Sequence, residues 1–249
     1  MKVMAMEWLI AEDNPKDRAF LADLLSDRAL RLATNGDEAF QIASSLAEPM
    51  VITDLQMPKL NGIEFARRLW RHSPQARIVF WSQHKDEMYV RSLAKIIPAE
   101  TVYGYVLKDN EPTPLRKAIE TVFLEGQCWI DPQLRPIQAR TQSRNEAIND
   151  FEYEVLVDIS LGLTDMMIAQ RRYLSRRGVQ NRLQSLYVKL GIDQERIAGD
   201  MGEAINMRAR AVAMALQRGL INAYELQEEE HRFKQWLERQ DSKASDNRL

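Results

Sequence analysis

Residues 50–58 read Met-Val-Ile-Thr-Asp-Leu-Gln-Met-Pro, a short apolar run that ends on a carboxylate. A run of this kind is typical of a strand that is buried on both faces of a parallel sheet. Four similar runs occupy residues 8–11, 30–33, 78–81 and 102–107, and amphipathic helical patterns fill the gaps between them. Because strands and helices alternate, the first half predicts an α/β domain with a five-stranded parallel sheet between layers of helices.

Polar side chains end four of these five runs. Glu12 and Asp13 follow the first, Asp54 the third, Ser82 the fourth and Lys108 the fifth. Since ligands of open parallel sheets bind at the carboxyl ends of the strands, we expect these groups to form one site. Three neighbouring carboxylates repel one another unless a hard cation lies among them, which favours Mg²⁺. With the Ser82 hydroxyl and the Lys108 ammonium nearby, such a site could accept a phosphoryl group on Asp54.

The second half of the chain is helical in pattern. After Gln127 the apolar periodicity lapses, and we interpret residues 128–147 as a linker. Helical periods resume at Phe151, and Thr164 and Ser175 are predicted to cap two further helices, the second of which runs to Leu190. Two helices joined by a tight turn, with a basic second helix, indicate a helix-turn-helix.

Charge is concentrated in that helix-turn-helix. Residues 168–192 contain six arginines and lysines and no acid, although the whole chain has a net charge of −2. Farther on, residues 193–206 form a polar insert, and residues 221–240 predict a long amphipathic helix whose apolar stripe is interrupted at the glutamates 228–230.

Composition limits the class of protein. With 249 residues, of which 45% are hydrophobic, the chain can build one large or two ordinary domains. One cysteine excludes an internal disulfide, and three scattered histidines exclude a Cys/His zinc cluster. No apolar run approaches the roughly 18 residues of a membrane span. We therefore expect a cytoplasmic protein that does not enter a membrane.

About the first 125 residues resemble the receiver domain of bacterial two-component response regulators. The resemblance is carried by Glu12-Asp13, by 53–58 with Asn61-Gly62, by Ser82, and by Gly104-Tyr105 with 107–109. It implies a flavodoxin-like, doubly wound fold.

The resemblance also implies roles for these residues. Asp54 would take a phosphoryl group from the histidine of a sensor kinase, beside Ser82 and Lys108. The cofactor would be Mg²⁺, held by Asp13, Asp54 and the backbone carbonyl of Gln56, with Glu12 completing the acidic pair. Tyr105 would be the switch aromatic that turns inward when Ser82 moves toward the phosphate.

Residues 148–192 resemble the LuxR-type DNA-binding domain of the NarL/FixJ family. Matching features include Glu152 and Glu154 before Val155-Leu156, then 162–164, and Lys189-Leu190-Gly191. Together with the patterns above, the resemblance divides the chain into four segments: a receiver at 1–127, a linker at 128–147, a helix-turn-helix domain at 148–220 with its insert at 193–206, and a helical, charged tail at 221–249 that lies outside the resemblance. A homodimer that binds double-stranded DNA is expected.

The recognition helix of this resemblance starts just after Ser175, and its side chains divide by chemistry. Gln180, Asn181 and Gln184 can pair with base edges in the major groove. The cations are assigned to phosphates, although Arg182 could serve either role: Arg176, Arg177, Arg182 and Lys189. Arg172 and Gly178 depart from the family, which usually has an apolar residue and a threonine there.

Two hypotheses follow for the function. The first is a phosphorylation-controlled transcription regulator, which is no enzyme beyond self-dephosphorylation. The alternative is a response-regulator adaptor that binds a protein through its basic domain and tail; Arg172, Gly178, the insert and the tail keep it open. A Mg²⁺-dependent phosphatase is a weaker third hypothesis because no separate base or substrate pocket is visible.

Overall fold

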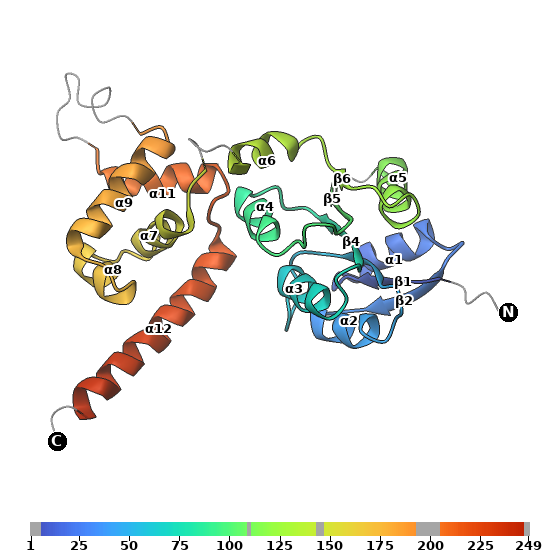
Figure 1. Cartoon of the computed structure of the whole chain (residues 1–249), viewed down its shortest axis with the longest axis horizontal. Coiled ribbons are helices and arrows are strands. Elements are labelled where there is room, and N and C mark those ends of the chain that lie inside the picture. The colour runs from blue at the N-terminus through green and yellow to red at the C-terminus, as the bar shows by residue number, and fades with distance from the viewer. Residues whose placement is uncertain (1–5, 109–110, 143–146, 193–204, 247–249) are drawn as a thin grey trace. The chain divides into compact units, whose positions relative to one another are not determined.

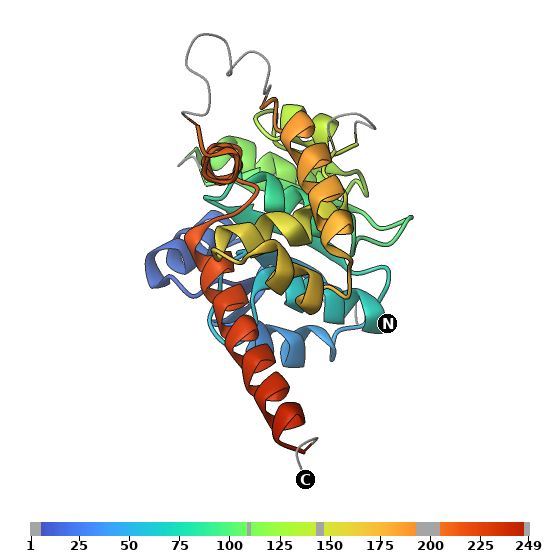
Figure 2. The ribbon, with the colours of Figure 1, turned by 90° about the vertical axis from the view of Figure 1, so that its left-hand side faces the viewer.

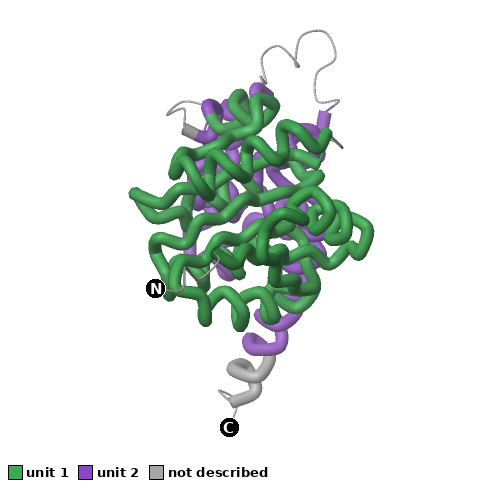
Figure 3. Tube along the Cα trace, turned by 90° about the vertical axis from the view of Figure 1, so that its right-hand side faces the viewer, with its two compact units in different colours: residues 1–85, 89–138 green, residues 86–88, 139–249 purple. Residues whose placement is uncertain are grey.

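The computed structural model describes residues 6–108, 111–142, 147–192 and 205–246 (Figure 1). The chain divides into two compact units: residues 1–85 with 89–138, and residues 86–88 with 139–249 (Figure 3). The first unit contains a parallel sheet, and the second is helical. The predicted fold class is therefore confirmed.

The sheet of the first unit has the strand order β2-β1-β3-β4-β5-β6, with every neighbouring pair parallel. Its strands are β1 (Glu7–Ala11), β2 (Ala29–Ala33), β3 (Met50–Thr53), β4 (Arg77–Ser82), β5 (Tyr103–Leu107) and β6 (Trp129–Ile130). The first five match the predicted strands. The sixth, only two residues long, was not predicted.

Helices cover both faces of this sheet (Figures 1 and 2). They are α1 (Pro15–Leu24), α2 (Gly36–Ala43), α3 (Gly62–His72), α4 (Glu87–Ala94) and α5 (Pro112–Phe123). Trp8 and Ile10 of β1 share one core with Leu21 of α1 and Phe123 of α5. Because successive strand side chains point to opposite faces, Leu9 lies on the other face, and both faces are buried.

Asparagine caps start the helices that follow β1, β2 and β3. The side-chain oxygens of Asn14, Asn35 and Asn61 accept backbone N–H groups of Lys16, Glu38 and Glu64. Asn14 and Asn35 follow their strands by three and two residues, whereas Asn61 follows β3 by eight, so the loop that carries Asp54 is the longest of the three.

Part of the predicted linker belongs to the first unit. After β6, the backbone N–H of Asp131 donates to the Tyr105 carbonyl at 2.9 Å, and Leu134 is fully buried. A further helix, α6 (Arg135–Gln142), follows. The predicted linker at 128–147 thus contains a strand and a helix that the sequence did not predict, because their few apolar anchors gave too short a pattern to recognise.

The described part of the second unit is helical. It comprises α7 (Asp150–Ser160), α8 (Asp165–Arg171), α9 (Arg176–Lys189), α11 (Met207–Gln217) and α12 (Ala223–Asp246), and it contains the helix-turn-helix as α8 and α9. Thr164 and Ser175 cap α8 and α9 as predicted. The predicted tail helix is present as α12, whereas the insert at 193–206 lies, except for its last two residues, outside the described residues.

A buried carboxylate organises this unit. Asp158 on α7 is completely inaccessible to solvent and accepts hydrogen bonds from Arg171 and Arg172, the latter through Nε at 2.8 Å and Nη2 at 3.0 Å. Arg171 also binds Glu229 of α12 at 3.0 Å, and its guanidinium lies 5.5 Å from the centre of the Phe233 ring. The C-terminal helix is therefore packed onto the helix-turn-helix through charged and aromatic contacts.

Within the residues that the structure describes, no helix has both the length and the apolar character needed to cross a bilayer.

Asp158→Asn should lower the free energy of unfolding of the helical unit by about 3 kcal/mol, because it leaves two largely buried arginines without their shared carboxylate. Thermal unfolding followed by circular dichroism measures this change. Glu230→Gln, which removes an exposed pair with Lys234, is the matched control and should change stability by less than about 0.5 kcal/mol. Equal effects of the two substitutions would contradict the assignment.

Candidate functional site

The carboxyl edge of the sheet gathers three carboxylates. Glu12 and Asp13 follow β1, Asp54 follows β3, and each offers an oxygen within 4.8 Å of the others. Glu12 and Asp54 are buried, whereas Asp13 is exposed. Oxygen ligands on one open side suit a hard divalent cation that retains several waters, so these residues fit Mg²⁺.

Lys108, which follows β5, is the cation of this site. Its Nζ lies 3.0 Å from Asp54 Oδ2, 2.8 Å from Glu12 Oε2 and 2.8 Å from Asp17 Oδ2. Burial lowers the pKa of Lys108, but Asp54, Asp17 and Glu12 outweigh that effect and raise it overall. Lys108 is therefore fully charged at neutral pH.

Asp17 was not among the predicted site residues. It lies in the first turn of α1, one helical turn after Asp13, which was the available signal. Arg18 was missed as well; its guanidinium donates to the backbone carbonyls of Glu12 at 2.7 Å and Asp13 at 3.2 Å. Arg18 thus holds the loop that carries the acidic pair, whereas Asp17 binds Lys108.

Asp54 itself is held by the backbone around it. Its Oδ1 accepts the N–H of Leu55 at 2.6 Å, and Gly62 N–H donates to the Leu55 carbonyl at 2.9 Å. A Cβ on Gly62 would lie 2.0 Å from the Asp54 carbonyl oxygen, so only glycine fits there. The motif Asn61-Gly62 thus positions the Asp54 loop sterically.

Ser82 and Tyr105 occupy neighbouring strands β4 and β5, and both are buried. Ser82 Oγ lies 3.5 Å from the backbone N of His84, and the Tyr105 hydroxyl donates to the His84 carbonyl at 2.6 Å. Gln56 Nε2 reaches the Tyr89 hydroxyl at 2.6 Å. Ser82, Tyr105 and the loop after β4 therefore form one connected group.

In the second unit, α9 presents a polar stripe to solvent. Arg176, Arg177, Gln180, Asn181 and Gln184 are all exposed and recur at helical spacing. Together they form what we call the α9 stripe. Val179, Leu183 and Leu186 on the opposite side of the helix are buried in the core.

Two residues assigned to phosphates lie off this stripe. Lys189 Nζ binds the Glu152 carboxylate at 2.7 and 2.9 Å, and its side chain is largely buried. Arg182 lies on the flank of α9 nearest α7, with its guanidinium 5.2 Å from the centre of the Phe151 ring. We accordingly leave Lys189 out of the proposed DNA contacts.

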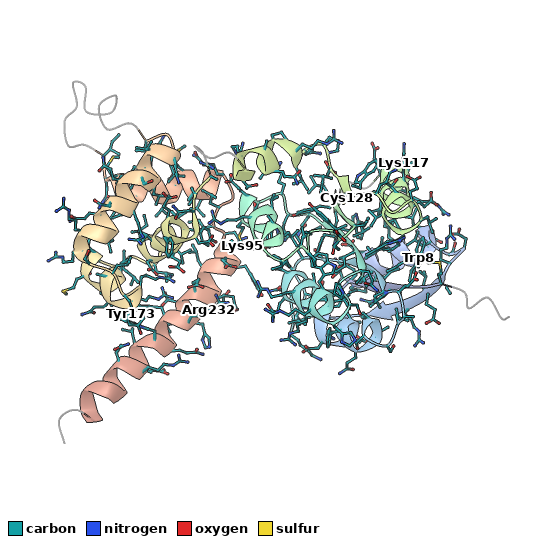
Figure 4. All side chains as sticks on the ribbon, in the orientation of Figure 1. Trp8, Lys95, Lys117, Cys128, Tyr173 and Arg232 are labelled. Atoms are coloured by element: carbon teal, nitrogen blue, oxygen red, sulfur yellow. The ribbon has the colours of Figure 1, made fainter. Side chains whose placement is uncertain are left out.

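The turn between α8 and α9 has unusual backbone geometry. Tyr173, labelled in Figure 4, has a φ of +53° and is 87% exposed. Non-glycine residues rarely adopt this left-handed region. The turn therefore presents an aromatic side chain just before the α9 stripe.

Comparisons with known proteins agree with both units. Residues 8–120 match the family model described as response regulator receiver domain. The transcriptional activator protein ExaE of Pseudomonas putida is 27% identical, over 86% of this chain and 97% of that protein. The nitrate/nitrite response regulator protein NarL of Escherichia coli K12 is 29% identical, over 73% of this chain and 88% of that protein.

Residues 8–120 are a response regulator receiver domain, and most of the chain is similar to response regulators such as NarL. Its fold is also similar to that of a solved two-component response regulator, RcsB, in a complex with DNA, with a TM-score of 0.56, 19% identity and coverage of 86% of this chain and 98% of that one. The members of this family are signalling proteins rather than enzymes. The acidic cluster lies within the receiver domain, and we call it the receiver site below.

The receiver site should make stability depend on pH. Burial, partly offset by Lys108, raises the pKa of Glu12 to about 7 from 4.5. The folded chain therefore holds this proton between these two pH values, and the stabilising contribution is lost as pH rises through about 7. In a metal chelator, the stability of the natural protein should fall relative to Glu12→Gln by roughly 2–3 kcal/mol between about pH 5 and 8.

Tryptophan fluorescence during urea unfolding measures this difference, because four of the five tryptophans, Trp8, Trp70, Trp81 and Trp129, lie in the first unit. If the free energies of unfolding of the natural protein and of Glu12→Gln change in parallel with pH, Glu12 does not bind a proton in the folded state near neutral pH.

Proposed function

We propose that this chain is a phosphorylation-controlled, DNA-binding transcription regulator of a two-component system. The observation that carries the proposal is the carboxylate cluster bound to Lys108 at the strand ends, in a chain that also presents the α9 stripe. A sensor histidine kinase would supply the phosphoryl group, and DNA would be the partner of the second unit. A cytoplasmic location and a homodimer belong to the proposal.

The proposed reaction takes place at Asp54. A carboxylate oxygen of Asp54 attacks phosphorus, the bond between phosphorus and the kinase histidine breaks, and the electron pair returns to the imidazole. The negative charge on the phosphoryl oxygens is met by the Lys108 ammonium, which already lies 3.0 Å from Asp54. The Ser82 hydroxyl is proposed to donate a hydrogen bond to the same group.

Glu12, Asp13, Asp54 and the backbone carbonyl of Gln56 would hold Mg²⁺. When bound, Mg²⁺ would neutralise charge on the carboxylates and on the incoming phosphoryl oxygens. The protein's own contribution is to keep these ligands together, with Arg18 fixing the carbonyls of the acidic pair.

The switch is proposed to run through β4 and β5. A shift of Ser82 toward a phosphoryl group would change the loop at His84, to which the Tyr105 hydroxyl is bonded. Tyr105 is buried in the structure, so its proposed inward position is available without phosphate. The lifetime of the phosphoryl group would depend on side chains near Gln56 and His84.

Relatives support the output side of the proposal. ExaE is named a transcriptional activator, and RcsB, similar in fold, was solved in a complex with DNA. In this chain the α9 stripe supplies amides for base edges and arginines for phosphates. Arg172, which had favoured an adaptor, is explained by its bonds to Asp158.

Asp54→Asn should abolish phosphoryl uptake from acetyl phosphate and Mg²⁺, because an amide oxygen is too weak a nucleophile to form the acyl phosphate. Intact-protein mass spectrometry measures the added phosphoryl group. Asp37→Asn, which changes an exposed acid on α2, is the control and should retain uptake. Persistent labelling of the Asp54 variant would move the acceptor elsewhere.

Binding to a genomic fragment library should enrich a sequence with two half-sites, more strongly with a phosphoryl mimic and Mg²⁺. Gln180→Ala should then relax sequence preference by about 1–3 kcal/mol at one base pair while leaving non-specific affinity nearly unchanged. Competition binding against single-base variants of the enriched site measures this. Gln227→Ala, at an exposed glutamine on α12, is the control.

An unchanged preference in the Gln180 variant would refute its base-reading role. A library that shows no enrichment in either state, even at low salt, would favour the adaptor, with a protein as the partner of the second unit.

A further inference from the structure

A hollow opens where the start of α7 crosses the flank of α9. Its volume is about 290 Å³, and its lining includes Phe151, Glu152, Gly178, Asn181, Arg182 and Ser185. Asn181 also belongs to the α9 stripe, so the hollow borders the surface proposed to face DNA. Figures 1 and 2 show α7 and α9 side by side.

Arg182 is held in place on this border. Its Nη1 donates to the Gly178 carbonyl at 3.1 Å, and its guanidinium lies over the Phe151 ring, 5.2 Å from the ring centre. A Cβ on Gly178 would lie 3.3 Å from Nη1, which is tighter than ordinary contact. A threonine here, which the family usually has, would require the guanidinium to move by a few tenths of an ångström.

The acid in the hollow is already satisfied. Glu152 accepts hydrogen bonds from Ser185 Oγ at 2.6 Å, from Lys189 Nζ and from the backbone of Asn149. Although burial raises the pKa of Glu152, the bonds from Lys189, Ser185 and Asn149 outweigh it and lower the pKa overall. Within the described ranges, no carboxylate forms an ion pair with Arg182, whose charge is left for an outside anion.

Phe151 is exposed beside this cation. The ring is 62% accessible, although it stands next to the core helix α9. Exposed aromatic surface beside an oriented guanidinium offers two chemistries at once, an apolar face and a hydrogen-bonding cation. A deoxyribose joined to its phosphate presents the same pair of groups.

We infer that Phe151 and Arg182 form a sugar–phosphate clamp at the edge of the DNA-binding surface. Arg182 binds a backbone phosphate, and the Phe151 ring orients the guanidinium and packs against the adjoining deoxyribose. This inference rests on the proposed function. Of the two roles open to Arg182, base reading and phosphate binding, it assigns phosphate binding, because a residue on the flank of α9 meets the edge of the groove. The base edges are left to the α9 stripe.

The test is the affinity of the full chain for two labelled duplexes, the enriched site and a scrambled one, between about 50 and 200 mM salt. Arg182→Ala should weaken binding to both duplexes equally. It should also make the plot of log affinity against log salt concentration shallower by about 0.9 per bound chain, because one phosphate contact contributes that much to the slope. Phe151→Ala should weaken binding to both about fivefold with little change in that slope. Phe151→Tyr, which keeps the aromatic ring, should bind both duplexes with the affinity of the natural protein.

Controls separate the clamp from charge and folding effects. Arg71→Ala makes the same change of charge at an exposed position of α3 and should leave the slope unchanged. Circular dichroism verifies that each variant is folded. Phe151→Leu, which keeps apolar volume, replaces Phe151→Ala if that variant does not fold, and Arg182→Gln, which also removes the charge, replaces Arg182→Ala.

Each outcome bears on a different claim. If the natural protein binds DNA, and both Arg182→Ala and Phe151→Ala bind it with the same affinity and the same salt slope, the clamp is overturned. The proposed function then still stands. Losses confined to the enriched duplex would also overturn it, because they indicate base reading. Natural protein that binds neither duplex would overturn the proposed function, and the clamp with it.

Discussion

One ammonium group holds the receiver site together. Lys108 meets Glu12, Asp17 and Asp54, which come from the end of β1, the start of α1 and the end of β3. Without a cation these carboxylates would repel one another at the edge of a low-dielectric sheet. The strand order therefore matters for electrostatics as well as for packing, because it brings Lys108 at the end of β5 to the carboxylates that follow β1 and β3. The ammonium that binds these carboxylates is also the charge that would meet a phosphoryl group.

The helical unit uses buried charge in a comparable way, but to build its core. Asp158 and Glu152 on α7 are satisfied by Arg171, Arg172 and Lys189. Half of the basic side chains in residues 168–192 thus serve the domain itself. Three of the six cations remain to face solvent: Arg176, Arg177 and Arg182. All three belong to α9.

The sequence predicted what depends on local patterns. Apolar runs placed five strands, capping residues placed α8 and α9, and polar residues at strand ends placed Glu12, Asp54, Ser82 and Lys108 together. Partners that are distant along the chain had no such signal, so nothing in the pattern linked Lys189 with Glu152 or Arg171 with Asp158. The short strand β6 was missed for a different reason, because two residues cannot show a period.

The packing of α12 has a consequence for how this protein can diverge from its relatives. The helix lies beyond the part of the chain that resembles the family, yet its Glu229 and Phe233 meet Arg171, which in turn meets Asp158. Arg171 is bonded to both Asp158 and Glu229, and Asp158 is bonded to Arg172 as well, so each of these charges keeps a partner when one contact is lost. A relative without this helix therefore keeps Arg171 paired with Asp158, and the helix can be lost without leaving a buried charge alone.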